Sequence, residues 1–170
     1  QYIPIVAGSL FTGTMNIANA IEDPLSATQF GIACDYMPDR ITGNYNYKAG
    51  SGEYINSKGE VISGKIDQCA LYAVFFKVDE KTQVLDGNNV LTHPNIVAIT
   101  EQPFRDSTPG NGLVAFDIPF IYKEGVTVDF QKNKYKIAII FSSSSKGDSY
   151  EGTPGSKMIV DNVRVTTKNE

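Results

Sequence analysis

The stretch DQCALYAVFFKV, from Asp67 to Val78, contains eight consecutive apolar or aromatic residues between Cys69 and Phe76. Aromatic and branched side chains suit the pleated surface of a β-strand, and the run is shorter than a typical buried helix. A strand that is apolar on both faces must be covered on both sides. We therefore predict that this segment is the central strand of the fold.

Two later segments are expected to be strands, and the second of them should lie beside the central strand. Leu113 to Tyr122 alternates apolar residues with a second set that contains Asp117 and Pro119. Because proline donates no backbone hydrogen bond, Pro119 should lie at an edge, at a bulge or where the ladder is already broken. Tyr135 to Phe141 is a second nearly continuous apolar run. The predicted core residues from these two segments are Phe116, Ile118, Phe120, Ile137, Ile139 and Phe141.

Shorter segments of alternating polarity, separated by glycine-containing turns, complete the expected set of strands. Thr14 to Ala33 is assigned to extended structure because Pro24 interrupts the helix that Ile17 to Ile21 would suggest. The alternation in Met158 to Thr167 slips at Asp161-Asn162, which predicts a β-bulge. The other predicted strands are SLFT after Gly8, Ile41 to Lys48, Ile96 to Thr100 and Thr127 to Phe130, with a hairpin formed by Glu53 to Asn56 and Glu60 to Ser63.

About ten short strands, with no alternation of strands and helices, predict an all-β fold. We expect an antiparallel two-sheet β-sandwich of the jelly-roll type, without a helix longer than about two turns. The 170 residues match the usual size of one domain, so we predict a single domain over residues 1–170. Because Gln1 is not an initiator methionine, we expect the chain to be processed or excised from something longer.

Composition excludes several classes of function. The formal net charge is -4, which does not provide the broad basic surface that nucleic-acid binding requires. No apolar stretch approaches the roughly 20 residues of a transmembrane helix, so we expect no transmembrane segment in this chain. Cys34 and Cys69 are too few for a disulfide scaffold and are interpreted as small buried residues, with a bond between them left open.

The sequence assigns no catalytic residue. The single histidine, His93, is followed by proline and is interpreted as a loop residue. Glycoside hydrolysis needs two carboxyl groups roughly 5 to 10 Å apart, and no strand offers two at alternating positions. An enzyme would have to combine carboxylates from separate strands, such as Asp117 with Asp67 or Asp148. No cofactor is required by any of these residues.

Several motifs together resemble one protein family, in an order and spacing that extend over nearly the whole chain. They are LFTG (10–13), GNYNYKAG (43–50), DQCALYAVFF (67–76), LDG (85–87), NIVA (95–98), FDIPFIY (116–122), YKIAIIFSSS (135–144) and GDSYEGTPGSKMIVDNV (147–163). The chain is similar to the putative carbohydrate metabolism domain family. The resemblance implies a jelly-roll β-sandwich, similar to non-catalytic carbohydrate-binding modules, in exported and often lipid-anchored proteins of Gram-negative bacteria. We therefore expect this domain to be the C-terminal module of a longer exported protein, with an extracellular or outer-membrane location.

The expected function is weak glycan binding on one sheet face. If Leu71 and its parity face the core, Tyr72 lies on the opposite face, which we prefer because tyrosine is less often fully buried. One aromatic ring with amide, ammonium, carboxylate and hydroxyl groups could bind a sugar. A structural or adhesion module and a glycoside hydrolase are the alternatives. The predicted ligand-binding residues are Asn44, Asn46, Lys48, Tyr72, Asp117 and Ser142.

Two further predictions concern the loops. Asp161, at the expected bulge, is the candidate ligand of a structural Ca²⁺, with a solvated carboxylate as the alternative. Asp148 and Tyr150 are the second choice for a binding site if the sheet face is wrong. The expected partners are a polysaccharide or glycan and other domains of the same polypeptide.

Overall fold

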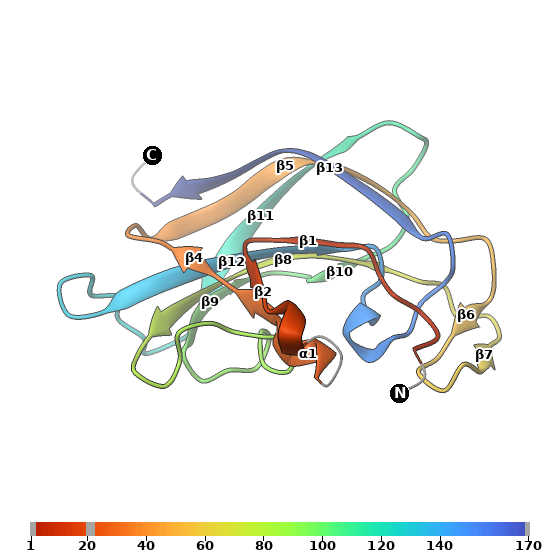
Figure 1. Ribbon diagram of the computed structural model, residues 1–170. Helices are drawn as coiled ribbons and strands as arrows, with labels where there is room; N and C mark the ends of the chain where they lie inside the picture. The colour runs from red at the N-terminus through yellow and green to blue at the C-terminus, as the bar shows by residue number, and fades with distance from the viewer. Residues whose placement is uncertain (1–2, 20–22, 169–170) are drawn as a thin grey trace.

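The computed structural model describes residues 3–19 and 23–168, and its centre is the predicted strand (Figure 1). This strand, β8 (Cys69–Val78), is buried at every position from Cys69 to Phe76. The continuous apolar run therefore corresponds to a strand that is covered on both faces, as predicted. The neighbours of β8 are all antiparallel: β12 (Lys134–Ser142) lies on one edge, and β9 (Ile96–Thr100) and β10 (Phe104–Arg105) share the other.

One nine-stranded antiparallel sheet forms most of the molecule, and it curls so that β5 and β13 pass over β8 and β12 (Figure 1). The all-β prediction is confirmed. The finer prediction of a two-sheet jelly roll is not confirmed, because β11 joins the two halves in a single ladder. The main order is β1 (Ser9–Phe11), β12, β8, β9, β11 (Val114–Tyr122), β5 (Pro38–Lys48) and β13 (Lys157–Thr167), while β4 (Ile32–Ala33) pairs with β12.

Strand β11 changes partner at its proline. Residues 114–119 pair with β5, whereas residues 120–122 pair with β9. Pro119, opposite Arg40, is the last residue of the first ladder. The missing N–H of proline therefore falls where the ladder is already interrupted, as predicted.

The inner face of the curled sheet holds the main core. Leu71, Ala73 and Phe75 of β8 pack there against residues from β5, β11 and β12, including Ile41. This is the preferred parity of the central strand. The predicted core is confirmed: Phe116, Ile118, Phe120, Ile137 and Phe141 are buried, and Ile139 is partly buried against them.

The other face of β8 is also covered, as the apolar run requires, and Tyr72 is buried there. Tyr72, Val74 and Phe76 form a second apolar cluster with Phe30 and Leu85. These covering residues come from the N-terminal region and from the loop that follows β8. The apolar run needed a cover here as well, and a local part of the chain supplies it.

The segment predicted as extended from Thr14 to Ala33 is wrong in its middle, and residues 20–22 lie outside the described part of the chain. A 3₁₀-helix, η1 (Ile17–Asn19), and a one-turn helix, α1 (Pro24–Ala27), interrupt the strands β2 (Gly13–Met15) and β3 (Thr28–Phe30). Proline suits the first turn of a helix, and the Asp23 side chain accepts a hydrogen bond from the Ser26 N–H. Pro24 thus begins a helix instead of preventing one.

The strand predicted from Thr127 to Phe130 is also wrong. The Asp129 carboxylate accepts hydrogen bonds from the backbone N–H groups of Gln131 and Lys132. Such local bonds favour a turn over a ladder. The short run from Thr127 to Phe130 was therefore insufficient evidence for a strand.

Two further predictions, the β-bulge and the hairpin, are confirmed. The register between β13 and β5 shifts between Asp161 and Arg164, and Asn162 has a left-handed φ of 53°. The hairpin consists of β6 (Tyr54–Ile55) and β7 (Val61–Ile62), which pair antiparallel. Cys34 and Cys69 are both buried free thiols, which settles the question of a bond between them.

Candidate functional site

A cavity of about 520 Å³ lies over the second face of β8. Its floor is formed by Ala70 and Tyr72 of β8 and by Ile140 and Ser142 of β12. The walls come from the N-terminal region, the turn after β8 and the loop between β12 and β13. The aromatic wall residues are Phe11, Phe30, Phe104 and Tyr150, and the polar residues around the cavity include Asn88, Thr92, Ser144, Lys146 and Asp148.

Tyr72 contributes a nearly buried ring to this cavity and is only 6% exposed. Burial raises the pKa of its phenol, and the neighbouring Asp148 carboxylate raises it further. The phenol is therefore neutral over the physiological pH range, where it can donate and accept hydrogen bonds. Tyr72 is part of the packed cluster as well as of the cavity floor, unlike the open aromatic platform that was expected.

Tyr150 provides an unusual polar group in the wall. Its backbone is left-handed, with φ of 59°, and it follows the short 3₁₀-helix η2 (Gly147–Ser149). Its hydroxyl oxygen is buried and has no hydrogen-bond partner in the described part of the chain. A buried hydroxyl without a partner is unfavourable, which makes this atom a candidate for a hydrogen bond to a ligand.

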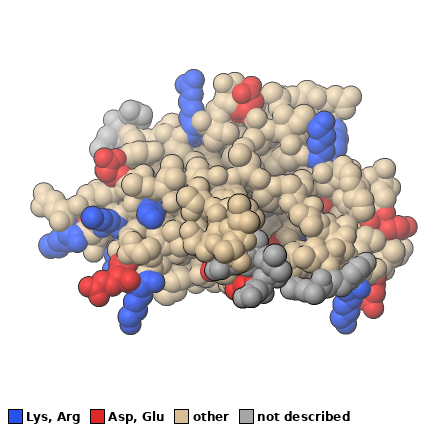
Figure 2. All heavy atoms as spheres, in the orientation of Figure 1, with Lys and Arg blue, Asp and Glu red and all other residues tan. Residues whose placement is uncertain are grey.

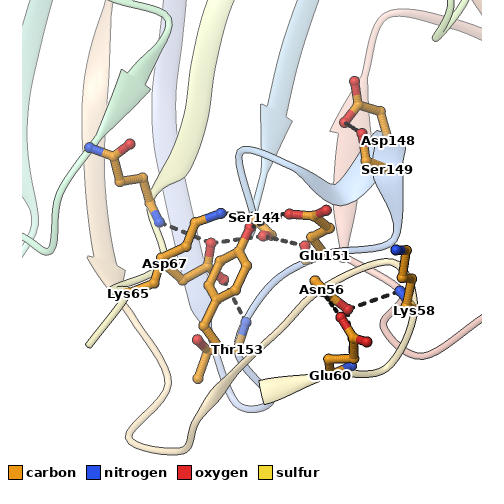
Figure 3. Close-up of polar contacts among 12 residues, drawn as sticks. Asn56, Lys58, Glu60, Lys65, Asp67, Ser144, Asp148, Ser149, Glu151 and Thr153 are labelled. Carbon is orange, nitrogen blue, oxygen red and sulfur yellow. Dashed lines mark hydrogen bonds and ion pairs between the residues drawn. The ribbon is translucent and has the colours of Figure 1, made fainter. Parts of the chain in front are cut away.

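Asp67 positions the loop that carries Tyr150 (Figure 3). The carboxylate is 1% exposed and accepts four hydrogen bonds, all between 2.8 and 3.0 Å. The loop contributes three of the four donors, and the fourth is the N–H of the next residue. Asp67 is therefore a fully bonded structural anchor, with no free lone pair turned toward the cavity. The donors are the hydroxyls of Ser144 and Ser156 and the backbone N–H groups of Gln68 and Thr153.

A second set of polar contacts, from Tyr54 and Lys65 to Glu151, supports the same loop from the side of β6 and β7 (Figure 3). The Tyr54 hydroxyl donates a hydrogen bond of 3.2 Å to Glu151, and the Lys65 ammonium lies 3.6 Å from the same carboxylate oxygen. Lys65 also lies 3.9 Å above the centre of the Tyr54 ring. Glu151 is thus held between two partners at the base of the loop.

The six residues predicted to bind a ligand do not share one surface. Tyr72 and Ser142 lie at the cavity, on the β8–β12 half of the sheet. Asn44, Asn46 and Lys48 alternate with Tyr45, whose ring packs against the inner core, so they lie on the outer side of β5. The predicted face is therefore wrong as a single arrangement, because the curl of the sheet separates its members. A ligand-binding role for the individual residues stays a prediction.

The β5 residues already have partners within the chain. The Asn46 amide donates hydrogen bonds to Thr108 Oγ1 at 2.9 Å and to the carbonyl oxygen of Gly112 at 2.8 Å. Lys48 donates to the carbonyl oxygen of Thr108 at 2.7 Å. These contacts hold the loop between β10 and β11 against the outer side of β5.

The suggested carboxylate pairs are not brought together as free acids. Asp117 accepts a hydrogen bond of 2.5 Å from Arg40 on the neighbouring strand, and Asp67 is occupied by its four donors. Asp161 accepts its hydrogen bonds from Asn162 at the bulge. Within the described residues, no group of three or more His, Cys, Asp and Glu is arranged for a metal ion, and Asp161 as a Ca²⁺ ligand stays a prediction.

The face of the molecule that carries the N-terminal strands is mostly uncharged (Figure 2). Lysine, arginine, aspartate and glutamate side chains lie mainly around its margin in this view. Among the described residues, no helix is long and apolar enough to cross a membrane.

Sequence reasoning missed most of the cavity. Phe11, Phe30 and Phe104 come from short segments. The sequence of such a segment does not show which way a phenylalanine side chain points. Tyr150 was predicted only as a second-choice site residue. The glycines on either side of it, Gly147 and Gly152, were a weak sign of a constrained loop. Asp67 was seen as the start of a strand, and nothing in the sequence indicated that a distant loop would supply its donors.

Solved structures similar to this chain are known from Bacteroides. A putative glycoside hydrolase from Bacteroides thetaiotaomicron is 36% identical, with a TM-score of 0.90 over 99% of this chain and 49% of that chain. A putative glycoside hydrolase from Bacteroides vulgatus is 35% identical, with a TM-score of 0.84 over 95% of this chain and 65% of that chain. The present chain thus spans about half of the first structure and under two thirds of the second.

The comparison with curated proteins finds no match. A family model, in contrast, matches residues 1–166. This match covers almost the whole chain and agrees with the motifs found in the sequence. The chain belongs to the putative carbohydrate metabolism domain family.

Proposed function

We propose that this chain is a non-catalytic carbohydrate-binding module, and that the cavity over Tyr72 receives part of a glycan. The observation that supports this most directly is the convergence of aromatic walls and polar groups on one cavity, including a buried Tyr150 hydroxyl without a partner. Membership of a carbohydrate-related family points to the same class of ligand.

The chemistry of the cavity suits a sugar that inserts an apolar portion. Aromatic rings contact the apolar faces of ligands, while a few placed polar groups determine the orientation. Tyr72 and Phe104 supply ring surface here. At the rim, the exposed Asp148 can accept hydrogen bonds from sugar hydroxyls and Lys146 can donate them. A neutral glycan is favoured because Lys146 and Asp148, which both line the cavity, carry opposite charges.

Hydrolysis is the second candidate function, because both Bacteroides relatives are described as putative glycoside hydrolases. Glycosidases generally use two carboxyl groups, one on each side of the scissile bond. Asp148 is the only carboxylate among the described residues that line the cavity. Asp67, a buried carboxylate, is saturated by hydrogen bonds. Binding is therefore the better supported function.

The wider setting is also part of the proposal. The Bacteroides chains extend well beyond the matched region, which is compatible with a module joined to other domains. We place this module on the outer surface of a Gram-negative bacterium or in a secreted protein, where polysaccharides are encountered. A structural or adhesion role in the same setting would require self-association instead of glycan recognition.

A glycan array followed by calorimetric titration tests the proposal. Binding to a defined glycan is expected in the micromolar to millimolar range, about -4 to -8 kcal/mol, because the cavity is small and contains no tryptophan. Asp148→Asn and Tyr150→Phe should weaken binding about tenfold each, whereas Asp35→Asn, a change at an exposed aspartate outside the cavity, should not.

Three results would overturn the proposal in different ways. Equal binding by all three variants would place the glycan elsewhere on the molecule. No binding together with strong self-association in sedimentation would support the adhesion module. Release of reducing ends from a polysaccharide, abolished by Asp148→Asn, would identify a hydrolase.

A further inference from the structure

A second cleft, of about 320 Å³, lies where β11 changes partner. The amino-terminal half of β11 pairs with β5, while only residues 120–122 pair with β9. On the other side, β10 pairs with β8 and has no further strand beside it in the described sheet. The two strands thus leave a gap in the ladder, and the side chains around this gap form the cleft.

Arg105 of β10 lines this cleft, and its side chain makes no hydrogen bond or ion pair to any other described residue. Its Nε atom is buried without a hydrogen-bond acceptor in the described part of the chain. No ion pair involves Arg105 within that part, although three other basic residues do form ion pairs. A guanidinium is permanently charged, so a buried N–H without an acceptor is unfavourable and calls for an anionic or strongly polar ligand. The planar geometry of the group matches a carboxylate, which can accept two parallel hydrogen bonds.

The remaining lining offers groups suited to sugar hydroxyls. Glu101 is exposed at the rim, and Asp117 lies opposite on β11. The Tyr45 ring also lines the cleft and is held edge-on by Phe116, with ring centres 5.9 Å apart. Asp117 is paired with Arg40, so its charge is largely balanced within the chain. Among the described residues, the cleft therefore presents a cation without an ion-pair partner, carboxylate acceptors and an aromatic ring.

The backbone beside Arg105 is also strained. Gln102, in the turn between β9 and β10, has a left-handed φ of 48°. Residues of this type rarely adopt such a conformation, and the strain is often associated with ligand sites. Gln102 itself lines the cleft, where its amide can donate to a hydroxyl or a carboxylate.

We propose that this Arg105 cleft binds a sugar residue that carries a carboxylate, namely a uronic acid. The carboxylate would bind Arg105, and the ring hydroxyls would bind Glu101 and Asp117. The volume is at the lower end of ligand sites, roughly 300 to 1,000 Å³, which suits a single sugar residue. Identification of the ligand as a sugar rests on the proposed carbohydrate function, whereas recognition of a carboxylate by Arg105 does not.

Titration of the whole chain with methyl glucuronide and with methyl glucoside, followed by NMR, tests this proposal. The two probes differ in the carboxylate, so the glucuronide should bind at least about tenfold more tightly. Arg105→Gln should abolish this preference. Arg105→Lys keeps the charge without the planar fork and should retain only part of it. Arg164→Gln, which removes a positive charge from the exposed edge strand β13, should leave the preference unchanged.

Several outcomes would contradict the proposal. Equal binding of both glycosides, or a preference that survives Arg105→Gln, would exclude Arg105 as the carboxylate site. Competition by acetate at the same concentration as the glucuronide would show that the sugar ring contributes nothing. Thermal unfolding of both Arg105 variants verifies that they are folded, and the lysine variant keeps the test decisive if the glutamine variant is not.

The outcome of this experiment can be separated from the proposal for the cavity over Tyr72. If Asp148→Asn abolishes glucuronide binding and Arg105→Gln does not, the cavity is the uronate site and the present inference is wrong. If glucuronide shifts follow Arg105 while no glycan responds to Asp148→Asn, the Arg105 cleft is supported and the function proposed for the cavity fails.

Discussion

Ser144 donates a hydrogen bond of 2.8 Å to Asp67, a residue 77 positions earlier in the chain. The bond joins the start of the central strand to the loop that forms one wall of the cavity. Two more donors from that loop, Thr153 N–H and the Ser156 hydroxyl, bind the other oxygen of the same carboxylate. The Asp67 carboxylate thus fixes the strand to the loop, and it has no part in the proposed sugar binding.

Asp67→Asn should destabilise the fold strongly. An amide in this place would turn its NH₂ group toward two of the four donors, and buried donors would lose their acceptor. The expected loss is on the order of 3 kcal/mol, since hydrogen bonds to charged groups are stronger than average. Urea unfolding measures it, with the exposed Asp35→Asn as control. A loss below about 1 kcal/mol would mean that the loop is held by other contacts.

Phe120→Ala should destabilise the protein by about 3 to 5 kcal/mol, because a buried ring would be replaced by a cavity. Phe120 is buried in the main core, just after the proline at which β11 changes partner. Equilibrium unfolding in denaturant gives the value. If the loss is under about 1 kcal/mol, Phe120 contributes little to the core despite its burial.

Tyr72→Ala should reduce stability as well as binding, which differs from the expectation for an exposed aromatic platform. Removal of a buried ring should cost about 3 kcal/mol, whereas Tyr72→Phe keeps the ring and should cost less than about 1 kcal/mol. A thermal-shift comparison of the two variants checks this. Stability of Tyr72→Ala equal to that of the unmodified chain would indicate that the ring is outside the packed cluster.

Stability should decrease as the pH rises above 9. Burial raises the pKa of the Cys69 thiol from 9.0 to about 12. Between these values the unfolded chain loses this proton while the folded chain keeps it, so alkaline conditions favour unfolding. Below pH 9 both states are protonated and Cys69 has no effect. Urea midpoints measured from pH 8 to 10.5 should therefore fall, with a shallower slope in Cys69→Ala.

A parallel measurement isolates the thiols. Neither Cys34 nor Cys69 should react with a thiol reagent in the folded protein at pH 8, because both are buried and protonated. Both should react after denaturation, and the mass should correspond to two free thiols. Rapid reaction of the native protein, or the same pH slope in Cys69→Ala, would contradict this account.

The local sequence pattern was sufficient to predict features that depend on a single strand. The apolar run in β8 identified a strand covered on both faces, and the slip at Asp161-Asn162 identified the bulge. Pro119 indicated an interrupted ladder because its missing N–H has the same consequence in any sheet. These inferences needed no knowledge of which strands are neighbours.

The site depended on information that a local pattern does not contain. Parity assigns Asn46 to one side of β5 and Tyr72 to one side of β8, but only the curl of the sheet decides whether those sides meet. Pro24 was interpreted as a helix breaker, although a proline at the first position begins a helix. Arg105 had no sequence signal at all, since an isolated arginine is normally solvated.

The position of β8 in the ladder has a consequence for how the chain is made. One edge of β8 can pair early with β9, but the other edge needs β12, which is synthesised more than fifty residues later. Until then, an uninterrupted apolar strand with a free edge is open to association with other chains. Folding from such distant pairings is also slow. The chain should therefore depend on a chaperone, or on remaining unfolded, until residue 142 is available.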